Sequence, residues 1–334
     1  MSLLLAGCSQ PAPQEEESPI RDAGAGKIFR ASDALDAIVP ADAVIEKLAG
    51  GFVFIEGPVW VRGWEGSPFL LFSDVRGNAI YKWDPATSET SDFRKPVFEG
   101  EVAEGRFVGS NGLLLDQDGN LLVCEHGNRR ISKVTPDGEW SVFVDQYEGK
   151  RLNSPNDLAW HSNGWLYFTD PPYGLLGQDE SEDKELDFNG IFRFNPADGA
   201  IELLEDSQTR PNGIGFSPDE KTLYVANSDS NPKAWYAYDV EDDGTLSGKR
   251  VFYDVTDQTA EGAPDGLKLD TDGNIYATGP GGVWIFSPDG RHLGTIQADE
   301  VPANVGWGAD GSTLYMTARA GLYRVKLSSS GKLP

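Results

Sequence analysis

SPNDLAWHSNGWLYFTD, residues 154–170, places an amide and a carboxylate side by side, Asn156 and Asp157, immediately ahead of an apolar run. The run ends at a Ser-Asn-Gly turn, and a second apolar run, LYFTD, follows the turn. An Asn-Gly turn between two short apolar runs is a strong indication of a β-hairpin. The stretch therefore predicts two antiparallel strands, the first of which begins with polar residues.

The same arrangement recurs along the chain, and neighbouring copies begin 38 to 56 residues apart. Each copy has a first apolar run, a turn that is usually Asp-Gly or Asn-Gly, and a second apolar run. The first runs are EGPVW (56–60), NGLLL (111–115), NDLAW (156–160), NGIGF (212–216), DGLKL (265–269) and ANVGW (303–307). Third and fourth apolar runs complete most copies, as ISKVTP and WSVFV do in the second.

A four-stranded unit repeated at this interval is typical of a β-propeller. We therefore predict an all-β fold, a six-bladed β-propeller with four-stranded blades. The last unit has only three runs before the chain ends, and VIEKLAG (44–50) is predicted to supply its missing outer strand and close the ring. A pair of β-sandwich domains is the structural alternative, but it does not account for a repeated column of polar residues.

Composition agrees with many short strands and tight turns. The 334 residues include 39 Gly, 9 Trp, 16 Phe and 11 Tyr, and the length suits one large all-β domain or two smaller ones. The formal net charge of −25 argues against nucleic acid or an anionic membrane surface as a partner, because both require clustered Lys and Arg. The acidity is compatible with a bound cation, although solubility alone also explains it.

The first residues are interpreted as a lipoprotein-like start. Leu5-Ala6-Gly7-Cys8 resembles a bacterial lipobox, although few residues precede Cys8, and an accidental apolar end is the alternative. Residues 1–27 are expected to form this start and a flexible tether, with a single propeller domain over 28–334. A possible lipid anchor at Cys8 would place the protein in the bacterial cell envelope or periplasm. No apolar stretch is long enough to span a membrane, and Cys124, in LLVCE, is expected to be a buried free thiol.

Propeller geometry turns the repeated column into a ring. The first strand of each blade lines the central channel, so its first residue lies at one mouth. Around the axis the column contains Glu56, Asn111, Asn156, Asn212, Asp265 and Ala303. Five of these six side chains offer an oxygen, and a divalent cation, Ca²⁺ above all, would relieve the repulsion between converging oxygens. Asn and Asp are also common turn residues, which is the simpler explanation for any single segment.

The ends of the second runs are expected to return to the same mouth as a second oxygen-rich layer. They contribute Asp74, Glu125 and His126, Asp170 and Asn227. The longer connections, of which residues 171–190 form the largest, also belong to this mouth and mark it as the functional face. No GxSxG elbow, HExxH helix or complete GxGxxG motif occurs. The acidic turns DQDGN and DTDGN lack the final Glu of an EF-hand loop and are predicted to be hairpin turns.

Several motifs resemble the SMP-30/gluconolactonase family. The likeness runs from about Phe52 to Leu327 and is most specific in CEHGNRR (124–130) and FTDPPYGL (168–175), which look like the bacterial gluconolactonase branch. The resemblance implies a six-bladed propeller with a central divalent metal and lactone-hydrolase activity. By position it implies Glu56, Asn156, Asn212 and Asp265 as metal ligands, with no contribution from Ala303.

The resemblance also suggests which residues face the substrate. Asn111 looks like a substrate-side residue beside the metal, His126 lines the same mouth, and Glu125, Asn156 and Tyr173 are further substrate-binding candidates. The implied reaction is metal-dependent opening of a sugar lactone, a small-molecule substrate, with Asp265 as general base and His126 as a second catalytic candidate. The metal is expected to be Ca²⁺, with Zn²⁺, Mg²⁺ or Mn²⁺ as alternatives. A non-enzymatic propeller that binds a sugar or protein at the mouth is the alternative function.

Overall fold

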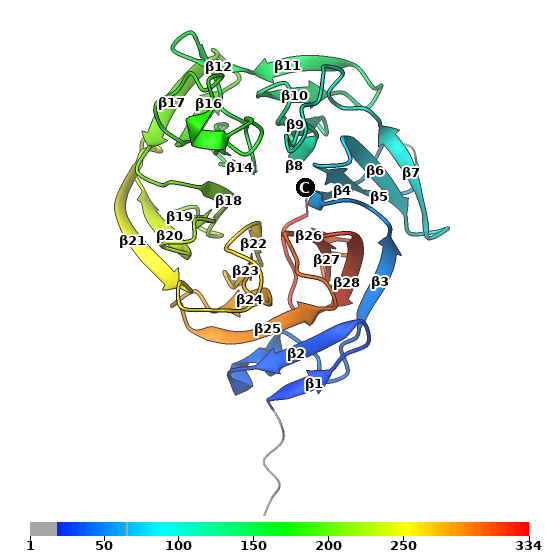
Figure 1. The fold of residues 1–334 in the computed structure, drawn as a ribbon. Helices are drawn as coiled ribbons and strands as arrows, with labels where there is room; N and C mark the ends of the chain where they lie inside the picture. The colour runs from blue at the N-terminus through cyan, green and yellow to red at the C-terminus, as the bar shows by residue number, and fades with distance from the viewer. Residues whose placement is uncertain (1–18, 65, 334) are drawn as a thin grey trace, which may run out of the picture.

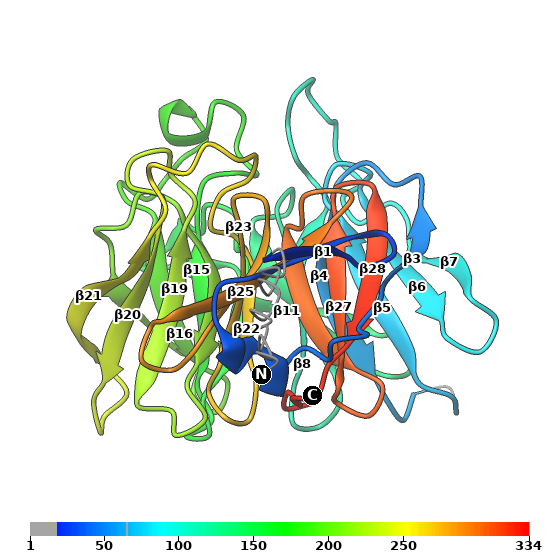
Figure 2. The same cartoon turned by 90° about the horizontal axis from the view of Figure 1, so that it is seen from below.

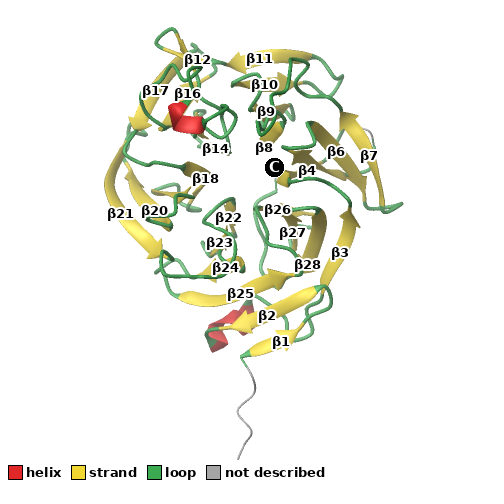
Figure 3. Cartoon of the chain, viewed as in Figure 1, coloured by secondary structure: helices red, strands yellow, loops and turns green. Residues whose placement is uncertain are grey.

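The computed structural model describes residues 19–64 and 66–333 and contains six sheets arranged around a central axis (Figure 1). Nearly all regular structure is β, apart from two short 3-10 turns, η1 (Asp33–Ala37) and η2 (Gln178–Glu180) (Figure 3). The predicted six-bladed propeller is confirmed. Among the described residues, no helix combines the length and apolar character needed to cross a membrane.

Each blade is an antiparallel sheet whose first strand lies nearest the axis. The first three blades are β4 (Ile55–Val61), β5 (Phe69–Asp74), β6 (Ala79–Asp84) and β7 (Glu89–Arg94); β8 (Ser110–Leu115), β9 (Leu121–Glu125), β10 (Arg130–Val134) and β11 (Trp140–Val144); and β14 (Leu158–Trp160), β15 (Leu166–Asp170), β16 (Gly190–Asn195) and β17 (Ala200–Glu205). A small hairpin, β12 (Gln146–Tyr147) and β13 (Lys150–Arg151), separates the second and third.

The fourth and fifth blades continue the same order. They are β18 (Pro211–Phe216), β19 (Thr222–Asn227), β20 (Ala234–Val240) and β21 (Leu246–Asp254); and β22 (Leu267–Leu269), β23 (Ile275–Gly279), β24 (Gly282–Phe286) and β25 (His292–Ala298). The sixth comprises β26 (Asn304–Gly308), β27 (Thr313–Ala318), β28 (Gly321–Lys326) and β3 (Ile45–Gly50). β3 pairs antiparallel with β28, for example Ile45 with Val325, so the predicted closing strand is confirmed.

The fifth sheet is wider than predicted because two N-terminal strands extend its outer edge. β2 (Gly26–Arg30) pairs with β25, and β1 (Ile20–Asp22) pairs with β2, as the lower edge of Figure 1 shows. The range expected to be a tether, residues 1–27, therefore includes β1 and the start of β2. These strands are held by Ile28, which is buried and pairs with Ile296. Residues 1–18, with the predicted lipobox at Cys8, lie outside the described residues.

The hairpin turns between first and second strands follow the predicted chemistry. In DQDGN the Asp116 carboxylate accepts hydrogen bonds from the backbone amides of Asp118 and Asn120, and Gly119 has φ +81°. Asp270 accepts in the same way in DTDGN. These carboxylates are therefore used within their own turns, which is a common role of Asp in tight turns. Cys124 is buried and free, as expected.

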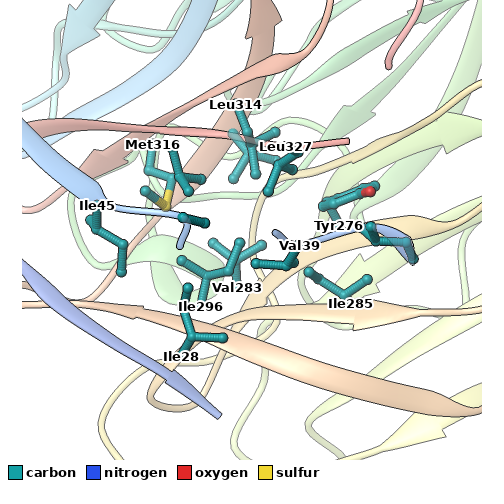
Figure 4. Packing of buried hydrophobic residues seen from close by; sticks show 14 of the residues in the cluster. Ile28, Val39, Ile45, Tyr276, Val283, Ile285, Ile296, Leu314, Met316 and Leu327 are labelled. Atoms are coloured by element: carbon teal, nitrogen blue, oxygen red, sulfur yellow. The ribbon is translucent and has the colours of Figure 1, made fainter. Parts of the chain in front are cut away.

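The closing strand is anchored by a core between the fifth and sixth blades. Ile45 packs there with residues of β2, β23–β25, β27 and β28, as Figure 4 shows for Ile28, Val283, Ile296 and Met316. Because side chains from the N-terminal segment and from the last two blades share this core, its packing connects the two ends of the propeller.

Ile45→Ala is expected to lower the free energy of unfolding by about 2–4 kcal/mol, since it removes a buried aliphatic side chain and leaves a cavity. The neighbouring Val44 is 52% exposed, so Val44→Ala is the control and should change stability by no more than about 0.5 kcal/mol. Denaturant unfolding of both variants measures the difference. Equal effects of the two substitutions would mean that β3 does not anchor the ring through this core.

Candidate functional site

The first residues of the inner strands converge at one mouth of the channel. A cavity of about 260 Å³ there is lined by five of the six column residues, namely Glu56, Asn111, Asn156, Asn212 and Asp265. The sixth, Ala303, is buried and is not part of the wall. The structure thus brings together the oxygen-bearing ring that the repeat predicted. The long connections, including η2, lie on one face of the propeller and the short hairpins on the other (Figure 2).

Close packing of the inner strands explains why glycine follows most column residues. A Cβ on Gly112 would lie 2.5 Å from the carbonyl oxygen of Asn156, and one on Gly213 would lie 2.2 Å from that of Asp265. The neighbouring strand therefore leaves no room for a side chain at these positions. In the two units without this glycine, the positions are occupied by Asp157 and Asn304.

Asp157 and Asn304 extend the polar ring one step deeper into the channel, which the sequence analysis did not identify. Asn304 Nδ2 lies 3.4 Å from Asp157 Oδ2, and Lys268 Nζ lies 3.4 Å from the same oxygen. Asp157 and Asn304 are both buried, each with 2% of its surface exposed. The sequence does carry a signal for these two residues. The position that follows the column is glycine in four units and polar in the other two, where Asp157 and Asn304 stand.

Hydroxyl groups on the second strands fix the backbone of the ring. Ser73 donates to the carbonyl oxygen of Asn111 at 2.7 Å, and Thr169 donates to that of Asn212 at 2.7 Å. Thr278 donates to the carbonyl oxygen of Ala303 at 2.8 Å. Each bond joins a second strand to the inner strand of the next blade, so the positions of the column residues are set by neighbouring blades together.

The expected second layer of oxygens has a different role from the one predicted. Asp74 accepts from the backbone amides of Val53, Phe54 and Gly77, and Asp170 accepts from those of Asn153 and Ser154. Asn227 accepts from the amide of Arg210. None of these three oxygen-bearing residues lines the cavity. Their carboxylates and amide hold the segments that lead into the inner strands, because those backbone amides have no strand partner.

Asp74→Ala is expected to reduce the free energy of unfolding by about 2–4 kcal/mol, because it leaves backbone amides without their charged acceptor. Asp84→Ala is the matched control, since Asp84 accepts one bond from the exposed amide of Ala86 at a surface turn. Comparison of the denaturation midpoints tests this prediction. A loss for Asp74→Ala no greater than for Asp84→Ala would contradict it.

Glu125 and His126 separate at the end of β9. The buried Glu125 carboxylate binds the Arg130 guanidinium at 3.0 Å and Asn128, and it is not part of the cavity wall. His126 is on the wall, and its Nε2 lies 3.3 Å from Asn111 Nδ2. Burial lowers the pKa of His126 to about 3, so its imidazole is neutral near pH 7. Asn111 Oδ1 and His126 Nδ1 are buried and have no hydrogen-bond partner among the residues that the structure describes.

The floor of the cavity concentrates negative charge. Burial raises the pKa of Glu56 to about 7, and the nearby Asp157 adds to the shift. Burial also raises the pKa of Asp265 well above its ordinary range, with further contributions from Glu56 and Asp157. Three carboxylates thus share the channel with the Lys268 ammonium. Such a group of oxygens is unfavourable unless positive charge compensates for it.

The donor set at the floor fits a hard divalent cation. Glu56 and Asp265 supply carboxylates, Asn156 and Asn212 supply amides, and Asn111 Oδ1 is a free acceptor beside them. Within residues 19–64 and 66–333, no three His, Cys, Asp or Glu side chains form a metal-binding group by themselves. Here amides take the places that further carboxylates would hold, and amide oxygens are ordinary ligands of Ca²⁺.

The loop after β15 places Tyr173 on the cavity wall. Its backbone is held at Gly174, whose amide donates to Ser154 Oγ and whose carbonyl accepts from Arg106 Nε. Burial, and then Asp265, raise the pKa of the Tyr173 phenol, so it remains protonated. Wall residues that were not predicted are Phe54, Val75, Arg76, Phe107, Ser228 and Ala263.

The opposite mouth holds a second cavity of about 340 Å³. It is lined mainly by apolar side chains, including Trp60, Trp160 and Trp307. Its Glu220 is engaged by Ser162 of a neighbouring hairpin. Although this cavity is larger, it lacks a ring of converging oxygens. We therefore place the candidate site at the mouth formed by the column residues.

Comparison with known proteins finds relatives along most of the chain. Residues 54–320 match the model of the SMP-30/gluconolactonase/LRE-like region. The chain is 42% identical to a gluconolactonase of Zymomonas mobilis over 317 residues, which cover 92% of this chain and 87% of the relative. It is 31% identical to the solved structure of a gluconolactonase of Xanthomonas campestris, with a TM-score of 0.78, covering 93% of this chain and 97% of that one. Regucalcin of Xenopus laevis is 26% identical, over 79% of this chain and 82% of the relative.

Proposed function

The chain belongs to the SMP-30/gluconolactonase/LRE-like family, and from this premise we propose that it is a lactonase that opens a sugar lactone at the mouth of the propeller. The observation that carries the proposal is the ring of Glu56, Asn111, Asn156, Asn212 and Asp265 around one cavity. Its oxygens and the neutral His126 beside them offer hydrogen-bond partners for a polyhydroxylated ring. The similarity to gluconolactonases over nearly the whole chain supports the same activity.

The size of the cavity favours a single sugar ring. Its volume of about 260 Å³ is close to the lower end of the roughly 300–1,000 Å³ found for small-molecule sites. Tyr173, Phe107 and Phe54 supply apolar surface along the wall, against which a sugar ring can pack. We therefore expect lactones of monosaccharide acids to react better than those of disaccharide acids.

The metal site proposed here is formed by Glu56, Asn156, Asn212 and Asp265, with Ca²⁺ as the preferred ion. Oxygen ligands suit Ca²⁺ or Mg²⁺, whereas Zn²⁺ prefers nitrogen and sulfur. The one imidazole on the wall, His126, lies against Asn111 rather than among the four ligands. When bound, a divalent cation supplies positive charge that polarises the lactone carbonyl.

Asp265 is proposed as the general base. Asp265 is only partly exposed, and loss of hydration raises the pKa of its carboxylate, which brings it closer to the range in which a base both accepts and releases a proton. In the proposed reaction it accepts a proton from the attacking water and returns it to the ring oxygen as the carbon–oxygen bond breaks. One lactone and one water molecule thus give one hydroxy acid.

Asn111 and His126 are proposed to orient the substrate rather than to transfer protons. The neutral imidazole of His126 is a weak acid, so it is better suited to a hydrogen bond with a ring oxygen or hydroxyl. Asn111 Oδ1 is buried without a partner in the described part of the chain, so it is available to a substrate hydroxyl. Tyr173, protonated and on the same wall, is a further hydrogen-bond donor.

The decisive experiment measures hydrolysis of a panel of aldonolactones by the purified protein, before and after treatment with a chelator. Rapid hydrolysis of at least one lactone, its loss after chelation, and its return with added Ca²⁺ are expected. Activity that persists with no divalent metal bound would overturn the metal proposal. Absence of hydrolysis across the panel, with lactones still bound at the mouth, would instead favour a non-enzymatic binding protein.

A further inference from the structure

The wall of the candidate site includes one cationic side chain, among the residues that the structure describes. Arg76 lines the cavity and is exposed to solvent, so we place it at the rim, whereas Glu56 on the same wall is buried and is placed at the floor with the partly buried Asp265. The guanidinium carbon of Arg76 lies 4.3 Å from the ring centroid of Phe107 and 5.5 Å from that of Phe54. Both phenylalanines also line the cavity. The cation is therefore held against aromatic surface at the entrance to the site.

The backbone that carries Arg76 is fixed at several points. Asp74 accepts from the amide of Gly77 just beyond it, and the carbonyl oxygen of Val75 accepts from the amide of Gly109. Asn78 binds the backbone of Phe98 with both ends of its amide. Asp74 also holds the amide of Phe54, so Arg76 and one of the rings that it contacts are positioned by the same carboxylate.

Neighbouring arginines on this face use their N–H groups to bind other described residues, whereas Arg76 does not. Arg210 forms a salt bridge with Asp179, and Arg106 donates to the carbonyl oxygen of Gly174. Arg76 forms no salt bridge with a described carboxylate, and the aromatic rings contact its cation without using its N–H groups. An exposed guanidinium with free donors is well suited to bind a carboxylate or a phosphate in a two-point manner.

We propose that Arg76 forms an anion subsite, and that the preferred substrates are monosaccharide lactones with a carboxylate or phosphate on the carbon chain away from the lactone carbonyl. This proposal rests on the proposed lactonase function and adds a substrate class to it. The lactone carbonyl lies at the acidic floor, and the anionic group reaches the rim. The net charge of −25 otherwise disfavours anionic substrates, so the local cation decides whether they bind.

The test uses two pairs of lactones that differ only in the charged group. Glucono-1,4-lactone is compared with glucaro-1,4-lactone for the carboxylate, and glucono-1,5-lactone with its 6-phosphate for the phosphate. The ratio of kcat/KM for the anionic member to that for the neutral member is measured for the wild type and for Arg76→Met. The substitution is expected to lower the ratio by about tenfold to a hundredfold for at least one pair. The pair that responds identifies the anion.

Most of the effect should appear in KM. The subsite lies away from the reacting carbonyl, so it stabilises the bound substrate and the transition state equally. Added salt should reduce the wild-type ratio and leave that of Arg76→Met almost unchanged. Arg76→Lys retains the charge without the planar fork and should keep part of the preference. Arg250→Met is the control. It removes one positive charge from β21, the outermost strand of its blade and far from the channel, and it should leave the ratio as in the wild type.

The outcomes separate this inference from the proposed function. If both neutral lactones are hydrolysed and Arg76→Met leaves both ratios unchanged, the anion subsite is wrong and the lactonase proposal stands. If the wild type hydrolyses none of the four lactones, the proposed function itself fails. A circular-dichroism melting curve matching that of the wild type is expected for Arg76→Met, since the side chain is exposed.

Discussion

Asp265→Asn is expected to leave the propeller folded and to lower kcat for the best lactone by about three orders of magnitude or more. Asparagine has nearly the same shape, so it can keep the contact with the Asn212 side chain. It cannot take a proton from water, and it removes one of the two carboxylates from the proposed ligand set. Because the substitution affects both the proposed base and the charge of the proposed metal site, it should be the most damaging conservative change in the protein.

Turnover and metal content of this variant must be measured together. Asp272→Asn is the matched control, since Asp272 is an exposed aspartate in the hairpin of the same blade at the opposite face, and it should retain full activity. A variant that binds metal and still turns over at the wild-type rate would show that Asp265 is not the base. The base would then have to be one of the other titratable groups on the wall, Glu56 or His126, because Glu125 is engaged by Arg130 and lies outside the cavity.

The column of polar residues was predictable because it depends on local rules. Asp-Gly and Asn-Gly turns define the hairpins, and a strand places its first residue at one end whatever lies beyond it. Register within each blade follows from pairing of the second strand, as in Leu158 with Phe168. Six repetitions of the same pattern then place Asn156 and Asp265 in one ring without reference to any long-range contact.

The parts of the site that were missed depend on connections and contacts that the repeat does not fix. Arg76 and Phe107 lie in connections that differ in length from unit to unit, so no repeat aligns them. The sequence predicts Glu125 at the mouth because this residue ends a second strand, like Asp74. Its carboxylate turns instead to Arg130, a partner that only the folded hairpin brings near. Similarly, the pairing of β2 with β25 joins residues more than two hundred positions apart, and no local sequence pattern predicts it.

Glu56→Gln is expected to have opposite effects on the metal-free and metal-bound forms. In the metal-free protein Glu56 is buried close to Asp157, and the high pKa of its carboxyl reflects the cost of charge at that place. Glutamine keeps an oxygen that can accept from the amide of Gly57, as Glu56 does at 3.0 Å, and carries no charge. Without metal the variant should therefore melt at a higher temperature than the wild type.

With metal the order should reverse. Loss of one of the two proposed charged ligands is expected to weaken Ca²⁺ binding by about a hundredfold or more, because affinity follows the charge of the ligand set. At a Ca²⁺ concentration a hundred times its dissociation constant, the wild type gains about 2.7 kcal/mol of stability, and the variant at the same concentration gains far less. Thermal melts with chelator and with Ca²⁺, together with calorimetric titration, measure both effects.

Glu89→Gln, at an exposed position on the outer strand of the same blade, should melt like the wild type in both conditions. If Glu56→Gln were stabilised by Ca²⁺ as strongly as the wild type, Glu56 would not be a ligand, and the carboxylate charge at the floor would have to be balanced by Lys268 and by protonation alone.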